Sequence, residues 1–211
     1  MSETCIHPTA IVEADVCLGA GVVLWDGVHV RARTTIGAAT TVGEKTYIAY
    51  DVQIGARAKI NAHVYICTGV TIEDGCLVAA HVVFTNDRAP RATDPELARM
   101  LPSEPTAATE RCRVARGASI GANATIGPGL TLGEYCMVGM GAVVTDDVPA
   151  HGLVVGNPAR LVGLVARDGT RVLRLERGEP LPSSQRVPCP GDGVLVVESG
   201  RVRHERAAAD G

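Results

Sequence analysis

A bulky apolar side chain recurs at every sixth residue over most of this 211-residue chain. The series runs without a miss through Ile6, Val12, Leu18, Leu24, Val30, Ile36, Val42, Ile48, Ile54, Ile60, Ile66, Ile72, Val78, Phe84, Val114, Ile120, Ile126, Leu132, Val138 and Val144. A period of six fits neither an α-helix, whose period is 3.6, nor a plain strand, whose period is two. It is typical of short strands separated by turns of constant length, and it predicts a parallel β-helix.

A small or modest side chain precedes each large one by two positions, as Thr40, Ala58 and Cys76 illustrate. Residues i and i−2 of a strand face the same side, so each repeat places one large and one small side chain in a narrow interior. Three repeats form a triangular coil of 18 residues, and the series corresponds to about seven coils. Glycine often follows the large residue, as at Gly37 and Gly121, and we expect it there because the turn requires unusual backbone dihedral angles.

The six-residue period is interrupted at residues 85–113 and returns in phase at Val114, after a net insertion of 24 residues. The interruption contains four prolines and mixed charges, so it predicts a long loop that leaves the β-helix. Loops of this length inside compact repeats are usually functional or disordered. The period ends before residue 160. We therefore divide the chain into an all-β domain that forms the parallel β-helix, residues 1–160, and a C-terminal β appendage with a loose tail, residues 161–211.

Composition excludes several classes of function. The net charge of −3 gives no broad basic surface for nucleic acid. No apolar run approaches 18 residues, and the N-terminus lacks the layout of a signal peptide, so we expect no membrane partner and a cytoplasmic location. The seven cysteines contain no CxxC pair, and Cys76 and Cys136 fall at inward small positions. Reduced thiols that fill the core are the expected state.

Three polar residues are spaced by one coil and should form a column on the outside of the helix: Lys45, His63 and His81. Two imidazoles about one strand spacing apart resist being charged together, which favours a neutral ring. A neutral imidazole is a competent general base, so we interpret the column, which we expect to lie beside the long loop, as a candidate catalytic site. The alternative interpretation is that these three residues are ordinary polar turn residues with no catalytic function. Tyr47 and Tyr65 are also one coil apart, and would stack on a base or cover a subunit interface.

The chain resembles the hexapeptide-repeat acyltransferases, and among them the N-acetyltransferases of nucleotide-linked amino-deoxysugars. The motifs that carry the resemblance are residues 59–63 (KINAH), 70–75 (VTIEDG), 84–92 (FTNDRAPRA), 116–126 (RGASIGANATI), 138–145 (VGMGAVVT) and 156–160 (GNPAR). The resemblance implies a left-handed β-helix, a homotrimer with sites in the grooves between subunits, and acetyl-CoA as the acyl donor. It also implies direct transfer of the acetyl group to the amine of a dTDP- or UDP-linked sugar.

The resemblance and the residue chemistry together give a set of candidate site residues. For catalysis we expect His63 as base, with His81 as second choice; orientation of the amine is the alternative role of His63. For substrate binding the candidates are Lys45, Asn61, Tyr65, Asn86, Asp87 and Arg91. For coenzyme binding, family analogy indicates Gly121, Asn123, Gly139, Ala142 and Arg160. The loop residues Asn86 and Asp87 also suit a simple turn at a strand exit.

Other functions are possible on the same fold. A different acyl-CoA enzyme would acylate an antibiotic, serine or a sugar hydroxyl. A γ-type carbonic anhydrase needs three zinc-binding histidines, and the spacing of His29, His63 and His81 does not supply them. A scaffold without catalytic activity would leave the histidine column unexplained. The stretch at Cys189 resembles half of the zinc ribbon that some relatives have. A structural zinc ion needs four soft ligands, and of these only Cys189 is present, so we expect no metal.

Overall fold

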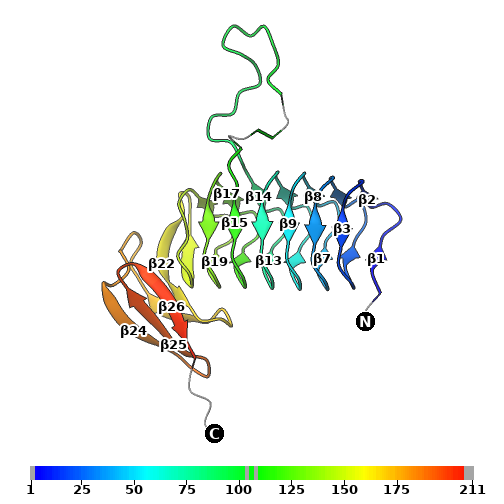
Figure 1. Cartoon of the computed structure of the whole chain (residues 1–211). Coiled ribbons are helices and arrows are strands. Elements are labelled where there is room, and N and C mark those ends of the chain that lie inside the picture. Colours follow the sequence, from blue (N-terminus) through cyan, green and yellow to red (C-terminus); the bar gives the residue numbers. More distant parts are fainter. Residues whose placement is uncertain (1–2, 103–104, 107–108, 207–211) are drawn as a thin grey trace.

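The computed structural model describes residues 3–102, 105–106 and 109–206, and this part of the chain is built of strands and turns with no helix, so no helix that could cross a membrane is present in it. Twenty two-residue strands wind into a prism with three parallel faces (Figure 1). Strands one coil apart pair in register, as Lys59 does with Thr41 on one side and Leu77 on the other. The predicted parallel β-helix with 18-residue coils is confirmed.

The three faces are named here A, B and C. Face A contains β1 (Cys5–Ile6), β4 (Val23–Leu24), β7 (Thr41–Val42), β10 (Lys59–Ile60), β13 (Leu77–Val78), β16 (Ser119–Ile120), β19 (Met137–Val138) and β21 (Gly152–Val155). Face B contains β2 (Ile11–Val12), β5 (His29–Val30), β8 (Tyr47–Ile48), β11 (Tyr65–Ile66), β14 (Val83–Phe84), β17 (Thr125–Ile126) and β20 (Val143–Val144). Face C contains β3 (Cys17–Leu18), β6 (Thr35–Ile36), β9 (Gln53–Ile54), β12 (Thr71–Ile72), β15 (Arg113–Val114) and β18 (Thr131–Leu132).

The interior of the prism is a continuous apolar core with one polar layer. The large residue of each repeat points inward and, from Leu24 onward, is almost fully buried. In one coil all three small positions are threonines, Thr34, Thr40 and Thr46, and each is fully buried. Their hydroxyl groups donate to carbonyl oxygens of the next coil, the Thr40 hydroxyl to Gly55 at 2.8 Å. The polar layer is therefore satisfied by hydrogen bonds between coils.

Buried cysteines occupy small inward positions, as the sequence predicted. Cys76 and Cys136 are each 1% exposed, and all seven cysteines are free thiols. Burial raises the pKa of the Cys76 thiol to about 11 and that of the Cys136 thiol to about 12. Thiols with such a pKa stay protonated near neutral pH, so these side chains act as apolar filler.

Three-residue corners join the faces, and we call them corners AB, BC and CA. The backbone is left-handed at the third residue of nearly every corner, with φ of 58° at His63 and 61° at His81. Glycines at the first position, such as Gly37 and Gly121, have no such angle, so the predicted dihedral requirement is wrong there. The reason is steric: a Cβ on either glycine would lie 2.5 Å from a backbone nitrogen of the next coil. Coils stack too closely at this position for any side chain.

The long loop leaves the prism at corner BC, after β14, and the chain returns at β15. It projects away from the prism in Figure 1. Arg88 anchors its base, because the guanidinium donates to Glu110 at 2.9 Å and to the Pro128 carbonyl at 2.7 Å. Leu97 and Met100 are 80% and 77% exposed. Residues 103–104 and 107–108 of the predicted loop lie outside the described residues.

The C-terminal part extends the prism and then forms a second sheet. Strands β22 (Arg160–Val165) and β23 (Arg171–Arg174) continue face A in antiparallel fashion beyond β21. Strands β24 (Ser184–Cys189), β25 (Gly193–Glu198) and β26 (Arg201–Glu205) form a three-stranded antiparallel sheet with its own core around Leu164 and Leu195. The strands up to Glu205 bury an apolar face and occupy most of the stretch, residues 161–211, for which the sequence predicts a β appendage and a tail. Residues 207–211 lie outside the described residues.

Candidate active site

The candidate site is the corner AB column, where Lys45, His63, His81 and Asn123 follow one another from coil to coil. The rings of His63 and His81 are stacked, with centroids 4.9 Å apart and planes 7° from parallel. The backbone N–H of His63 donates to the Glu44 carbonyl at 2.9 Å, and that of His81 donates to the Ala62 carbonyl at 3.1 Å, so the left-handed corner holds both residues in place. Both side chains are exposed. The predicted alignment of the imidazoles is confirmed, whereas their catalytic role stays a prediction.

Towards the C-terminal end, corner AB carries almost no side chains. Gly121, Gly139 and Gly141 leave the backbone bare beside the column, and Asn123 and the 84%-exposed Met140 project from it. The N–H groups of Gly121 and Gly139 donate to carbonyls of the next coil at 2.8 Å. A narrow ligand lying here would therefore meet backbone surface and the Asn123 side chain.

Two further residues predicted for coenzyme binding have different surroundings. Ala142 is fully buried and faces the core, so only its backbone can reach a ligand. Arg160 lies at the C-terminal end of the prism, where its guanidinium donates to the Ala159 carbonyl at 2.8 Å and lies 3.6 Å from Asp146. Asp146 is 79% exposed, and a more strongly charged anion could replace it.

On the N-terminal side of His63, a cavity of about 330 Å³ opens at corner AB. Its lining includes the predicted substrate residue Asn61, together with Trp25, Glu44 and Lys59. Sequence reasoning missed these three residues. The available signal was the spacing of Trp25, Gly43 and Asn61 by one coil. It puts these residues in one column, where Gly43 leaves a gap between the Trp25 and Asn61 side chains.

Face B lies next to the column and carries the two tyrosines. Tyr65 is 44% exposed, and its ring stacks on Tyr47 with centroids 5.5 Å apart. The Tyr47 hydroxyl accepts a hydrogen bond of 2.6 Å from Arg31, which holds that ring in place. Tyr65 therefore presents a supported aromatic face beside corner AB.

The loop residues Asn86, Asp87 and Arg91 do not join the histidine column within one chain. They line a separate cavity of about 680 Å³ at corner BC. A carboxylate oxygen of Asp87 accepts from the Ala89 N–H at 2.8 Å, as in a turn at a strand exit. The expected position of the column beside the loop is wrong, because β14 carries the chain across the whole of face B between His81 and Asn86.

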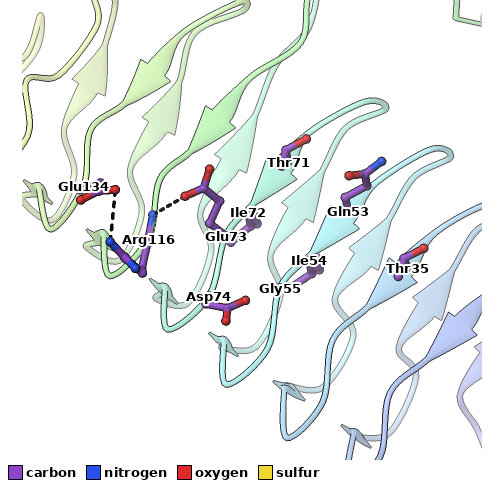
Figure 2. Close-up of a pocket in the computed structure, with 10 residues that line it drawn as sticks. All are labelled: Thr35, Gln53, Ile54, Gly55, Thr71, Ile72, Glu73, Asp74, Arg116 and Glu134. Atoms are coloured by element: carbon purple, nitrogen blue, oxygen red, sulfur yellow. Dashed lines mark hydrogen bonds and ion pairs between the residues drawn. The ribbon is translucent and has the colours of Figure 1, made fainter.

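A third cavity, about 710 Å³, runs along face C and corner CA (Figure 2). Its ten lining residues include no histidine or cysteine. Figure 2 shows Arg116 between two carboxylates: a carboxylate oxygen of Glu73 accepts from the Arg116 N–H at 2.9 Å, and the Arg116 guanidinium lies 3.5 Å from Glu134. Carboxylates are the groups of this groove that could act as a base, and each is engaged: Glu73 with Arg113 and Arg116, Asp74 with Arg57, and Glu134 with Arg116.

A second histidine cluster lies where the C-terminal sheet meets corner CA. His151 is 2% exposed and stacks between Tyr135 and His204, with ring centroids 5.5 and 5.9 Å away. Its Nδ1 lies 2.9 Å from the Val165 carbonyl oxygen, which can only accept, so Nδ1 carries a proton. Burial lowers the pKa of His151. No group of three or more metal-binding side chains was found in the described part of the chain, and Cys189 is buried in the small sheet.

A prism built of stacked six-residue repeats is the fold of the hexapeptide β-helix proteins. The family model described as "Bacterial transferase hexapeptide (six repeats)" matches residues 51–86 and 111–146. "Hexapeptide repeat of succinyl-transferase" matches residues 9–44. Together these matches cover just over half of the chain, which belongs to the hexapeptide-repeat transferase family and has its left-handed β-helix fold.

Curated relatives match over short stretches. A dTDP-3-amino-3,6-dideoxy-alpha-D-galactopyranose 3-N-acetyltransferase from Aneurinibacillus thermoaerophilus is 54% identical over 57 residues, which are 27% of this chain and 30% of that protein. A protein named as an acetyltransferase from Staphylococcus aureus is 44% identical over 48 residues, which are 23% of this chain and 24% of that protein. The chain thus spans less than a third of the length of these relatives.

Among solved structures, a hexapeptide-repeat acetyltransferase from Vibrio cholerae, complexed with acetyl coenzyme A, has a TM-score of 0.50 and 22% sequence identity. The match covers 65% of this chain and 70% of that chain. At this identity the likeness establishes the fold.

Proposed function

We propose that this protein is an acetyl-CoA-dependent N-acetyltransferase whose acceptor is the amine of a nucleotide-linked amino-deoxysugar. The observation that carries the proposal is the His63–His81 stack, which lies between a bare corner and a cavity on the same edge of the prism. The name of the Aneurinibacillus relative supports the choice of acceptor. The bare corner at Gly121 and Gly139 suits a long, narrow acyl donor.

The chemistry assigned to the site is direct transfer. The acceptor amine attacks the thioester carbonyl carbon, a C–N bond forms, the C–S bond breaks, and coenzyme A leaves as a thiolate. A ring nitrogen of His63 accepts the proton that the amine loses, and the thiolate takes up a proton in turn. A positioned base of this kind is typically worth about 10²–10⁴ in rate. Positioning both substrates on one edge supplies a further part of the acceleration.

A homotrimer is part of the proposal. Asn86, Asp87 and Arg91 lie across face B from the column, so a site that uses both needs a second copy of the chain. The loop carries the exposed side chains of Leu97 and Met100, and corner AB carries exposed Met140. Packing the loop of one subunit against corner AB of the next would cover these apolar groups.

The experiment is an acceptor panel. The protein is incubated with acetyl-CoA and dTDP- or UDP-linked aminosugars while free thiol release is followed. Each aminosugar is paired with the analogue that has a hydroxyl in place of the amine, and serine is included as an unrelated acceptor. Thiol release that requires the sugar amine is expected. Release with serine or with the hydroxyl analogues alone would overturn the choice of acceptor and leave a different acyltransferase.

A further inference from the structure

The cavity on the N-terminal side of His63 has one aromatic wall. The indole of Trp25 is 51% exposed at corner AB, which is unusual exposure for a large apolar side chain. The residue one coil further on is Gly43, which provides no side chain to cover the indole. A Cβ on Gly43 would lie 2.6 Å from the Ala62 nitrogen, so coil stacking keeps this position empty. The gap above Trp25 is therefore built into the stacking of the coils.

The chain has two lysines against eighteen arginines, and both lie near this cavity, because Lys45 directly follows the lining residue Glu44. Lys59 lines the cavity from face A. The side chain of Lys45 leans towards the coil that carries Trp25, because its Cγ lies 3.2 Å from where a Cβ of Gly27 would be. In the described part of the chain neither ammonium forms an ion pair, whereas most arginines there do. Two unpaired cations thus flank an exposed aromatic face.

This combination fits one class of ligand. A flat aromatic base stacks on an indole, and flexible ammonium groups suit a diphosphate. The cavity, about 330 Å³, is at the lower end of the size range of small-molecule sites. The carboxylate of Glu44, which also lines it, can accept hydrogen bonds from ring hydroxyls. Ala62 lines the cavity and directly precedes His63. A sugar attached to the diphosphate would therefore lie beside the His63 imidazole.

We infer that this cavity binds the nucleoside diphosphate of the acceptor, with the base stacked on Trp25 and the diphosphate between Lys45 and Lys59. The inference rests on the proposed function and names its acceptor subsite. It also fixes the order of the two substrates along corner AB. The nucleotide lies on the N-terminal side of the histidines, and coenzyme A lies on the C-terminal side.

Trp25 is the single tryptophan of the chain, so its fluorescence reports directly on this cavity. Titration with dTDP or UDP should quench the emission in a saturable way. Coenzyme A, which also carries a nucleotide, should not quench it. The variants Lys59→Met and Lys45→Met should each lower the affinity for dTDP or UDP roughly tenfold, as expected for loss of one charge-assisted contact. The matched control is Arg174→Met, an exposed cation on β23, which should bind dTDP like the parent protein.

Kinetics separate this inference from the proposed function. Trp25→Ala should raise KM for the nucleotide-linked sugar roughly 5- to 100-fold with little change in kcat, and Trp25→Phe should recover part of the loss. Turnover of an aminosugar without quenching and with an unchanged KM in Trp25→Ala would overturn the inference and leave the function standing. Saturable quenching by dTDP without turnover of any aminosugar would uphold this cavity and reject the function. Quenching by coenzyme A but not by dTDP or UDP would also overturn the inference.

Discussion

His63 and His81 lie one coil apart with their imidazole centroids 4.9 Å from each other, yet they hold different positions along corner AB. Residues 59–62, directly before His63, all line the cavity, whereas before His81 only Ala80 does, and His81 lies next to the bare corner that continues to Asn123. The base should therefore be the ring nearer the acceptor. The neighbour would support that ring and line the donor side.

The first prediction concerns this division. His63→Ala should lower kcat by about 10²–10⁴, because the amine proton loses its acceptor. His81→Ala should have a smaller effect, and His204→Ala, on β26 of the C-terminal sheet, should have none. Steady-state kinetics on the aminosugar would check the ranking. Full activity of His63→Ala at neutral pH would overturn the assignment of His63 as the base.

The second prediction concerns the shared site. Coexpression of His63→Ala with Asp87→Ala chains should restore activity that neither variant has alone. In a random cyclic trimer roughly a quarter of the interfaces would combine an intact histidine with an intact loop. The activity of the mixed assembly, together with its mass by light scattering, provides the measurement. Mixed trimers as inactive as the single variants would show that His63 and Asp87 do not combine across a subunit interface.

The third prediction follows from His151. Burial, with the neighbouring His204, lowers the pKa of His151 below its ordinary value of 6.5, although Glu134 and Asp192 act in the opposite direction. The unfolded chain then takes up a proton more readily than the folded one below about pH 6.5. The free energy of unfolding should stay level above that pH and fall as the pH drops below it.

Urea unfolding between pH 5 and 8 would measure this dependence. In His151→Phe the fall on acidification should be weaker. The variant should also be less stable by about 1 kcal/mol at neutral pH, because the Val165 carbonyl loses its donor. His7→Ala is the control, because it removes an imidazole that is only partly covered. An equally steep fall in His151→Phe would assign the acid sensitivity to other groups.

The fourth prediction concerns the polar layer of the core. The Thr40 hydroxyl donates to Gly55 at 2.8 Å and accepts from the Ala58 N–H at 3.0 Å. Thr40→Val keeps the shape but leaves a buried N–H without an acceptor, so it should cost about 1–3 kcal/mol. The outward-facing Thr35→Val should change stability by less than about 0.5 kcal/mol. Equal stabilities of these two variants, measured by thermal or urea unfolding, would contradict the role of the hydroxyl.

The fifth prediction distinguishes two reasons for glycine. Gly121→Ala places a Cβ 2.5 Å from the Met140 nitrogen, so neighbouring coils must separate. Gly75 has a φ of 69° with nothing within 4 Å of a Cβ, and Gly75→Ala should cost only about 1 kcal/mol of backbone strain. Gly121→Ala should be clearly the less stable protein in urea unfolding. The reverse order would restore the dihedral explanation.

The sequence predicted whatever depends on the six-residue period. Because the period sets the register between coils, the residue numbers alone placed His63 over His81 and Tyr47 over Tyr65. The same period directed Thr40 and Cys76 to the interior. These relations need only the count of residues between two positions.

Features that depend on more than the count were not predicted. The side of the prism from which the loop leaves is an exception that the count does specify: one strand of face B separates His81 from Asn86, so the expectation that the loop lies beside His81 was wrong. The cavity at Trp25 arises from a missing side chain on the adjacent coil, so it depends on three stacked residues together. A β appendage was expected at residues 161–211, but its strand pairing and its core around Leu195 were not, because this stretch has no period and short apolar runs do not specify antiparallel pairs.

The insertion at corner BC leaves no trace in the coils on either side of it. Thr71 pairs with Arg113 and Ile72 with Val114 in the same register that uninterrupted coils show. Under the proposed function, the winding of the coils and the recognition of the acceptor are thus separate properties of this chain. A segment of different length or composition, spliced in after Phe84 with its two ends held together, could alter which acceptor is admitted while the stack of coils stays as it is.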